Sequence, residues 1–371
     1  MSNVTESLQN GSCRNSLIVE GSASPVVSAL MFALGVLGNL TALLLLEVRR
    51  RKERSRKQHE QHQRRSLFHV LVTALVLTDL AGTCMISPLV QAAHALDTTL
   101  FGMSNAACQY FGFAMTFFSL VTLSLLLAMA LERYLSIGFP YLYGRHVSLR
   151  CGYVTIPCIY ALCALFCFMP FFDIGSYVQY CPGTWCFIDM NPSKSKHRVF
   201  ANVYATVILL MVVSVVACNC FVAYHLVLMY RRRTVNCGAV VMRNRKDRRH
   251  FSLSEEMEYL ILLIFMTAIF VICSLPLMIR VYINSIQPKG SDRTDLIALR
   301  FISINSIINP WVFIILSPSR LRFLLGALCK AGRTSIYRTS IAKNSEGASD
   351  QCQNITVTAE FASLNKSAQM I

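Results

Sequence analysis

The sequence predicts an all-α membrane protein: a bundle of seven transmembrane helices with a short amphipathic helix after the seventh span. Of its 371 residues, 54% are hydrophobic and only 15% are charged, a balance typical of polytopic membrane proteins. The hydrophobic residues gather in seven runs, each long enough as a helix to cross a membrane. The net charge of +16 lies mainly in loops between these runs, rather than on a soluble domain that could bind nucleic acid.

The first 24 residues are polar and carry two glycosylation triplets, beginning at Asn3 and Asn10, which would be used if this end is extracellular. They lack the apolar core of a cleavable signal peptide, so we expect the first span to act as its own insertion signal. The expected organisation is an extracellular N-terminus at 1–24, a seven-transmembrane domain at 25–317, an amphipathic membrane-surface helix at 318–330 and a disordered cytoplasmic tail at 331–371.

Basic loops set the predicted topology of the spans. Clusters of basic residues follow the first and fifth spans, at Arg49-Arg50-Arg51-Lys52 and Arg231-Arg232-Arg233. Since cytoplasmic loops are enriched in Lys and Arg, these loops are predicted to be cytoplasmic and the N-terminus extracellular. The first six spans cover about 25–48, 66–95, 106–137, 151–172, 199–230 and 258–283, and the seventh follows Asp295 and runs to Leu316.

Glycine and proline give several spans individual features. Gly35 and Gly38 mark a face of the first span that should pack closely on a neighbour. Pro157 and Pro170 interrupt the fourth span, and Pro276 predicts a hinge in the sixth.

The seventh span carries the most informative charge, Arg300. A guanidinium within a span costs about 2.5–3.5 kcal/mol on insertion scales. One interpretation is that Arg300, being near one end, extends its side chain to the lipid headgroups. We favour the other, in which it faces the bundle interior and binds an anion, because charges inside a membrane are functional by default. Asn309-Pro310 lies about 13 Å deeper and adds a polar hinge, so this helix is expected to act as a ligand-driven switch.

A polar stripe is predicted on the second span. Asp79 lies near the middle of that span, and Thr83, Ser87 and His94 continue the same face towards its outer end. The hydroxyls could equally bond to their own helix. A carboxylate in the middle of the membrane should face the interior and have a polar partner there.

The third span ends in Glu132-Arg133-Tyr134. Glu132 and Arg133 can neutralise each other at the cytoplasmic face, and the alternative is an ordinary interfacial pair. After the seventh span, the segment Ser319–Cys329 predicts an amphipathic helix on the inner leaflet, with Cys329 a candidate palmitoylation site.

Cys13, Cys108, Cys181 and Cys186 fall on the predicted extracellular side, where thiols oxidise. Their number alone does not assign the pairing. The Pro182-Gly183 pair between the last two predicts a tight turn.

Local motifs in five of the spans resemble those of rhodopsin-like G-protein-coupled receptors. They are Gly38-Asn39, Leu77-Thr78-Asp79-Leu80, Glu132-Arg133-Tyr134, Pro276 and Asn309-Pro310. The loop from Gln179 to Phe187 and the seventh span from Leu299 to Phe313 narrow the resemblance to prostanoid receptors, with the E-type members most similar. The resemblance covers nearly all of residues 25–330.

The resemblance implies that the ligand is prostaglandin E2 and that its carboxylate pairs with Arg300. Arginine suits this task because its planar fork matches a carboxylate and stays charged. His94 stands where a tyrosine is usual, so carboxylate capture would rest more on Arg300 and Thr184. The implied ligand-binding residues are Arg300, Thr184, Thr83, Ser87, His94 and Ser119.

The same resemblance implies the disulfides Cys108–Cys186 and Cys13–Cys181. It further implies a stimulatory G protein that raises cyclic AMP, arrestin as a candidate partner, a plasma-membrane location, and no cofactor or metal. Asn309 replaces the aspartate common in prostanoid receptors. The expected activation switch comprises Asp79, Glu132, Arg133, Pro276, Asn309 and Pro310.

Three alternatives remain open. The ligand could be another prostanoid, prostaglandin D2 or prostacyclin, because selectivity depends on a few apolar contacts. A transporter of organic anions would also need an intramembrane arginine, but the odd number of spans and the lack of visible repeats disfavour it. An intramembrane enzyme is disfavoured because the histidines do not show metal-ligand spacing.

Overall fold

The computed structural model describes residues 16–19, 25–56, 62–192, 194–235, 243–286 and 292–316. The predicted glycosylation sites Asn3 and Asn10, Cys13, Cys329, the helix expected at 318–330 and the tail at 331–371 lie outside these residues.

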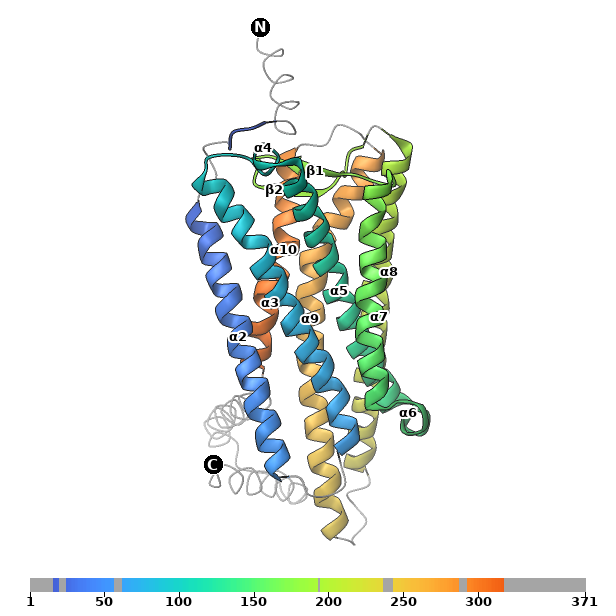
Figure 1. The fold of residues 1–371 in the computed structure, drawn as a ribbon. Helices are drawn as coiled ribbons and strands as arrows, with labels where there is room; N and C mark the ends of the chain where they lie inside the picture. The colour runs from blue at the N-terminus through green and yellow to red at the C-terminus, as the bar shows by residue number, and fades with distance from the viewer. Residues whose placement is uncertain are drawn as a thin grey trace, which may run out of the picture. The chain divides into compact units, whose positions relative to one another are not determined.

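Within the described residues, seven helices are long and apolar enough to cross a membrane, and they confirm the predicted fold class (Figure 1). Their spanning parts begin and end within a few residues of the predicted bounds. The long helices are α2 (Pro25–Arg56), α3 (His62–Ala95), α5 (Asn105–Gly138), α7 (Leu149–Phe168), α8 (Ser195–Val235), α9 (Arg243–Ile286) and α10 (Asp292–Ile315). Three short helices, α4 (Leu100–Met103), α6 (Pro140–His146) and the 3-10 turn η2 (Met169–Phe172), lie between them.

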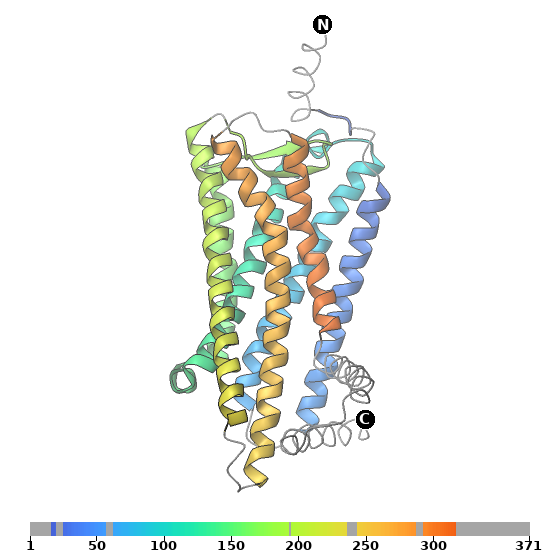
Figure 2. The same ribbon diagram turned by 180° about the vertical axis from the view of Figure 1, so that it is seen from behind.

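Burial in the bundle follows the expected pattern for helices packed in lipid. The middle helix α5 buries most of its length, and α7 exposes apolar side chains such as Leu162 and Leu165, which are 66% and 67% exposed. Such a surface is unfavourable in water and suits hydrocarbon. Figure 2, the view from behind, shows α9 and α10 side by side at the front of the picture, and these two helices pack against each other.

Glycines let α2 approach its neighbours closely, as the sequence predicts. A Cβ on Gly35 would lie 3.0 Å from the methyl group of Thr83, and one on Gly38 would lie 2.8 Å from the indole nitrogen of Trp311. A larger residue at either position would separate α2 from α3 or α10. The prolines at 276 and 310 lie inside α9 and α10, in the places predicted for hinges.

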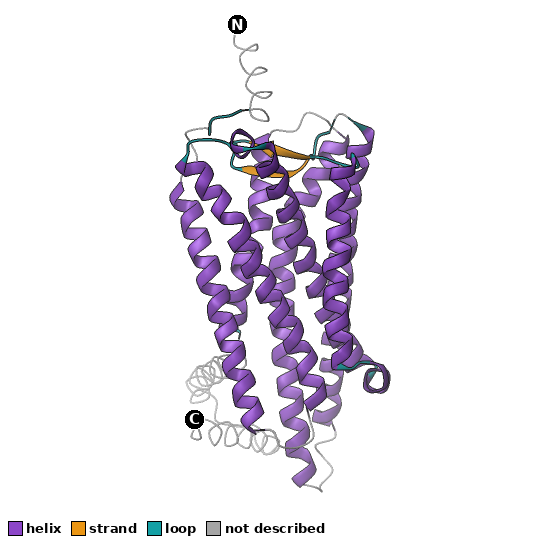
Figure 3. Cartoon of the chain, in the orientation of Figure 1, coloured by secondary structure: helices purple, strands orange, loops and turns teal. Residues whose placement is uncertain are grey.

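One end of the bundle carries a small antiparallel hairpin, β1 (Tyr177–Tyr180) and β2 (Trp185–Ile188) (Figure 3). We name this the outer end, since the sequence predicts it to be extracellular, and the opposite end the inner end. The tight turn predicted at Pro182-Gly183 closes the hairpin, with the Gly183 N–H donating to the Tyr180 carbonyl at 2.8 Å. Gly183 has a φ of +100°, and a Cβ there would lie 2.3 Å from Thr99, so only glycine fits.

The hairpin is fixed to the bundle and to the N-terminal segment. The disulfide Cys108–Cys186 joins β2 to the start of α5, which confirms that predicted pair. Cys181 is also disulfide-bonded, and because Cys13 lies outside the described residues its pairing with Cys13 stays a prediction. The N–H of Leu100 donates to the Gly183 carbonyl at 2.9 Å, and that of Thr99 donates to the Leu17 carbonyl at 3.1 Å. Together these segments form a lid over the outer end.

Candidate functional site

A cavity of about 450 Å³ lies under the lid, between α2, α3, α5, α9 and α10. Its volume falls within the range of about 300–1,000 Å³ that small-molecule sites occupy. Most of its lining is apolar, with Met31, Ile86, Phe111, Met115 and Phe270 among the contributors. All six residues predicted to bind a ligand line it: Thr83, Ser87, His94, Ser119, Thr184 and Arg300. Their role in binding stays a prediction, but the fold brings them to one place.

Helix α3 supplies the polar stripe of the cavity, because successive lining residues recur at helical spacing. Thr83, Ser87, Val90 and His94 are separated by four, three and four residues, which keeps them on one face. The Thr83 hydroxyl donates to the main-chain carbonyl of Asp79 at 2.7 Å. It thus bonds to its own helix, which is one of the two roles expected for these hydroxyls. It still lines the cavity, where its oxygen can accept a further hydrogen bond.

Arg300 lines the cavity from α10, eight residues after the helix begins. Its side chain is exposed, and in the part of the chain that the structure describes it makes no ion pair. The position agrees with the interior-facing interpretation of this residue. A guanidinium at a mostly apolar cavity, with no carboxylate partner among the described residues, is suited to receive an anion from outside the protein.

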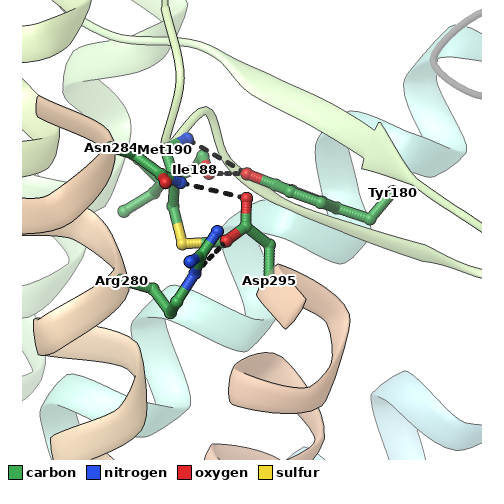
Figure 4. Close-up of polar contacts among 6 residues, drawn as sticks. All are labelled: Tyr180, Ile188, Met190, Arg280, Asn284 and Asp295. Carbon is green, nitrogen blue, oxygen red and sulfur yellow. Dashed lines mark hydrogen bonds and ion pairs between the residues drawn. The ribbon is translucent and has the colours of Figure 1, made fainter. Parts of the chain in front are cut away.

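A second arginine near the outer end, Arg280 of α9, is paired (Figure 4). Its Nε donates to Asp295 of α10 at 2.7 Å, and the Asn284 amide donates to the other carboxylate oxygen at 3.0 Å. Asp295 is 2% exposed. Beside this cluster, the Tyr180 hydroxyl of the lid donates to the Ile188 carbonyl at 2.8 Å. The cluster therefore ties the outer ends of α9 and α10 together beneath the lid.

Sequence reasoning did not identify this pair. An arginine within the sixth span and an aspartate at the start of the seventh were available signals. Which of the two arginines takes the carboxylate depends on how the helices pack, and that is not local in sequence. Ser28, Thr122 and Phe270 also line the cavity without any signal that singled them out.

The deep end of the cavity reaches the carboxylate of Asp79, which is 2% exposed. The Thr122 hydroxyl of α5 donates to one carboxylate oxygen at 2.9 Å, and the Asn309 amide of α10 donates to the other at 3.1 Å. These two hydrogen bonds confirm the prediction that the Asp79 carboxylate has a polar partner inside the bundle. The cavity connects the lid to a polar contact among α3, α5 and α10.

At the inner end, the predicted Glu132–Arg133 pair is formed and buried. Arg133 donates from Nε to Glu132 at 2.5 Å and from Nη2 at 2.9 Å, with both side chains 3% exposed. Two neighbours hold the pair: the Tyr143 hydroxyl of α6 donates to Glu132 at 2.7 Å, and the guanidinium lies 4.7 Å from the centre of the Phe68 ring. This burial distinguishes the pair from an ordinary interfacial one.

A third group of charges lies on the surface of the outer end. The ring of His197 bonds to Ser176 at 3.1 Å and to Asp173 at 3.3 Å, and Lys194 lies 3.7 Å from the same carboxylate. The hydrogen bond with His197, and next the charge of Lys194, lower the pKa of Asp173. The carboxylate is exposed, so solvent screens these interactions.

Comparison with known proteins agrees with this architecture. The family model of the seven-transmembrane receptors of the rhodopsin family matches residues 38–313. The prostaglandin E2 receptor EP2 subtype of Homo sapiens is 47% identical over 340 residues, covering 89% of this chain and 92% of that receptor. The prostacyclin receptor of Mus musculus is 40% identical over 346 residues, covering 92% of this chain and 79% of that one.

A solved structure supports the fold alone. Squid rhodopsin superposes with a TM-score of 0.65 at 15% identity, over 81% of this chain and 78% of the rhodopsin chain. The relatives are receptors rather than enzymes, and receptors of this kind are multi-pass plasma-membrane proteins with a lipid ligand and a G protein as partners. The chain therefore belongs to the prostanoid receptors of the rhodopsin family of seven-transmembrane receptors.

Proposed function

We propose that this receptor binds prostaglandin E2, couples to a stimulatory G protein and raises cyclic AMP. The observation that carries the proposal is Arg300, a guanidinium with no described carboxylate partner on the wall of an apolar cavity. Prostaglandin E2 is a lipid acid, with a carboxylate to meet that charge and hydrocarbon chains to meet the apolar wall. The greater identity to prostaglandin E2 receptors than to prostacyclin receptors favours this ligand.

In the proposed complex, the ligand carboxylate binds Arg300 below the lid and accepts a hydrogen bond from Thr184. Hydrogen bonds to charged groups contribute about 1.5–3 kcal/mol each, more than neutral ones. The oxygens of the ring and chains meet the hydroxyls of Thr83, Ser87 and Ser119, which line the cavity from α3 and α5. The apolar lining covers the rest of the molecule and contributes through its removal from water.

Activation requires that the ligand bind one packing of the helices better than the other. Arg300 and Asn309 lie on the same helix, and Asn309 contacts Asp79. We propose that a ligand held by Arg300 shifts α10 about Pro310 and changes this contact. The inner ends of α5, α8 and α9 then separate, Arg133 leaves Glu132, and the G protein binds there.

The test is cyclic AMP in cells that express the full chain and receive prostaglandin E2. Arg300→Ala should lower potency about 30- to 150-fold, equivalent to losing about 2–3 kcal/mol of charge-assisted bonding. Arg300→Lys should recover part of it, since lysine keeps the charge without the fork. Cell-surface expression, measured by antibody, is the control. Full potency of Arg300→Ala at normal expression would contradict the proposal.

The prostacyclin receptors, at 40% identity, support a second candidate ligand. Competition binding with prostaglandin E2, prostaglandin D2 and a stable prostacyclin analogue separates these possibilities. Prostaglandin E2 should compete most strongly. Accumulation of radiolabelled ligand inside cells would instead indicate a transporter.

A further inference from the structure

The junction between α6 and α7, at the inner end of the bundle, carries basic side chains that the proposed function does not use. Arg145 and His146 lie in the last turn of α6, and Arg150 lies in the first turn of α7. All three are exposed, and none makes an ion pair with another described residue. We name these three residues the junction patch. Figure 1 shows α6 projecting sideways from the bundle beside the start of α7.

Contacts with the bundle give α6 a fixed place. Its buried residue, Tyr143, donates a hydrogen bond to the buried carboxylate of Glu132 at 2.7 Å. The end of α6 also contacts the start of α7, because the Cys151 thiol lies 3.5 Å from the His146 carbonyl. The basic side chains on the two helices are therefore held beside each other rather than on a loose loop.

The packing of α7 determines the direction in which Arg150 points. Gly152 lies so close to α3 that a Cβ there would be 2.3 Å from Leu67. At about 100° of rotation per residue, the positions two before and two after Gly152 lie about 160° around the helix from it. These positions are Arg150 and Val154, and Val154 is 62% exposed. Arg150 therefore lies at the inner end of the lipid-facing side of α7, on which Leu165 is also exposed.

The positive charge of the junction patch has no described counter-charge. At the inner end, the carboxylates among the described side chains are those of Glu47 and Glu132. Glu47 is paired with Arg51 at 2.9 Å, and Glu132 is paired with Arg133 at 2.5 Å. An arginine whose stem lies along hydrocarbon places its guanidinium in the headgroup layer, where phosphate is the abundant anion. Guanidinium and phosphate form charge-assisted, often bidentate, hydrogen bonds.

We propose that the junction patch binds the headgroup of an anionic phospholipid of the inner leaflet, with the acyl chains lying along the exposed face of α7. The inner end is predicted to be cytoplasmic, and the cytoplasmic leaflet is the one that holds anionic lipids. A lipid fits better than an acidic protein segment, because Tyr153 and Val154 beside Arg150 are exposed and apolar. The inference goes beyond the proposed function and does not depend on which prostanoid the receptor binds.

The experiment uses the ligand-free, full-length receptor in phosphatidylcholine nanodiscs that contain a photoreactive phosphatidylinositol bisphosphate. Peptide mass spectrometry locates the crosslinks, and the share of probe in the bilayer is varied to find half-maximal labelling. The wild type should be labelled within residues 140–158. A basic residue near an anionic surface strengthens binding about 5-fold. Arg145→Gln and Arg150→Gln should each therefore raise the half-maximal share of probe about 5-fold, and the double variant about 25-fold.

Arg50→Gln is the matched control, because Arg50 is also an exposed arginine at the inner end, on α2. This variant should keep the half-maximal share that the wild type shows at residues 140–158. A photoreactive phosphatidylcholine should label the same residues of the wild type at least about 5-fold less, because its headgroup carries a cation beside the phosphate.

Three results would overturn the inference: no labelling of residues 140–158 in the wild type, equal labelling by the two lipid probes, or an equal loss in Arg50→Gln. Equal labelling by both probes would indicate ordinary contact with the bilayer, and an equal loss in the control would indicate a general attraction of the inner end to anionic lipid. The comparison of the two probes uses only the wild type, so it stands even if a variant fails to fold. No prostaglandin is present, so these results leave the proposed function untouched.

Discussion

Arg280 and Arg300 lie on neighbouring helices near the same end of the bundle, yet their surroundings differ. Arg280 is paired at 2.7 Å with a carboxylate that is 2% exposed, and its own side chain is 19% exposed. Arg300 is exposed to the cavity and has no ion pair within the described residues. A charge inside a membrane protein needs a partner. We therefore infer that Arg280 has a structural role, whereas Arg300, which has no ion pair within the described residues, is our proposed contact for the ligand.

The largest effect should come from breaking the ion pair between Arg280 and Asp295. Arg280→Ala leaves the Asp295 carboxylate buried without its cation, which costs about 3–5 kcal/mol. Thermal unfolding of detergent-solubilised receptor should show a large fall in Tm. The double variant Arg280→Met with Asp295→Leu should recover much of it, since apolar replacements of a buried pair are often neutral. A Tm of Arg280→Ala equal to that of the wild type would remove the distinction between the two arginines.

Arg300, which has no ion pair within the described residues, should behave in the opposite way to Arg280. Arg300→Ala should leave the Tm of the ligand-free receptor unchanged or slightly raised, because an unpaired guanidinium contributes no ion pair to the fold. Saturating prostaglandin E2 stabilises the wild type by mass action, and the variant should lose most of that gain. A large fall in the ligand-free Tm would instead show that Arg300 is structural.

A smaller effect is expected at the inner end, where Tyr143 contacts the buried Glu132–Arg133 pair. Tyr143→Phe removes one hydrogen bond to the buried Glu132 carboxylate, worth about 1.5 kcal/mol. If the Glu132–Arg133 pair holds the receptor inactive, cyclic AMP without ligand should rise several-fold at equal surface expression. Tyr143→Ala should act in the same direction. Unchanged or lower basal cyclic AMP in both variants would argue against this role.

The smallest effect is expected at the exposed Asp173. Because its folded pKa is lowered, the contribution of its contacts to stability is present above its unfolded pKa and is lost as pH falls through the folded one. His197→Gln weakens the main cause of the shift. The Tm difference between variant and wild type should therefore be small near pH 6, should shrink only below about pH 4, and should vanish once the pH has fallen through the lowered pKa of the folded state, where the carboxyl is protonated. A difference that grows in acid would contradict the direction of this shift.

How far the sequence predicted these features depends on whether the information is local. The seven spans, the inner-end pair and the Pro182-Gly183 turn follow from residues close together in the chain, and the structure confirms them. The Cys108–Cys186 bond came from family resemblance rather than from the cysteines themselves. Thr83, Ser87 and His94 were placed on one face because helical spacing alone determines that.

Tertiary pairing was harder to predict. Nothing in the local sequence says that Asp295 contacts Arg280 of the preceding helix rather than Arg300 of its own. The register of the hairpin places Tyr180 opposite Trp185. The residues on either side of the turn do not alternate strongly between apolar and polar, so their pattern does not predict this register. Whether Ser28 and Phe270 line the cavity depends on how α2 and α9 are rotated about their axes in the bundle.

The most direct test of the central claim compares prostaglandin E2 with its methyl ester on the wild type and on Arg300→Ala, by equilibrium binding. If the guanidinium waits for the ligand carboxylate, the variant should lose about 30- to 150-fold in affinity for the acid and only a few-fold for the ester. Equal losses for acid and ester, or no loss for the acid, would show that the unpaired charge of Arg300 does not receive the ligand.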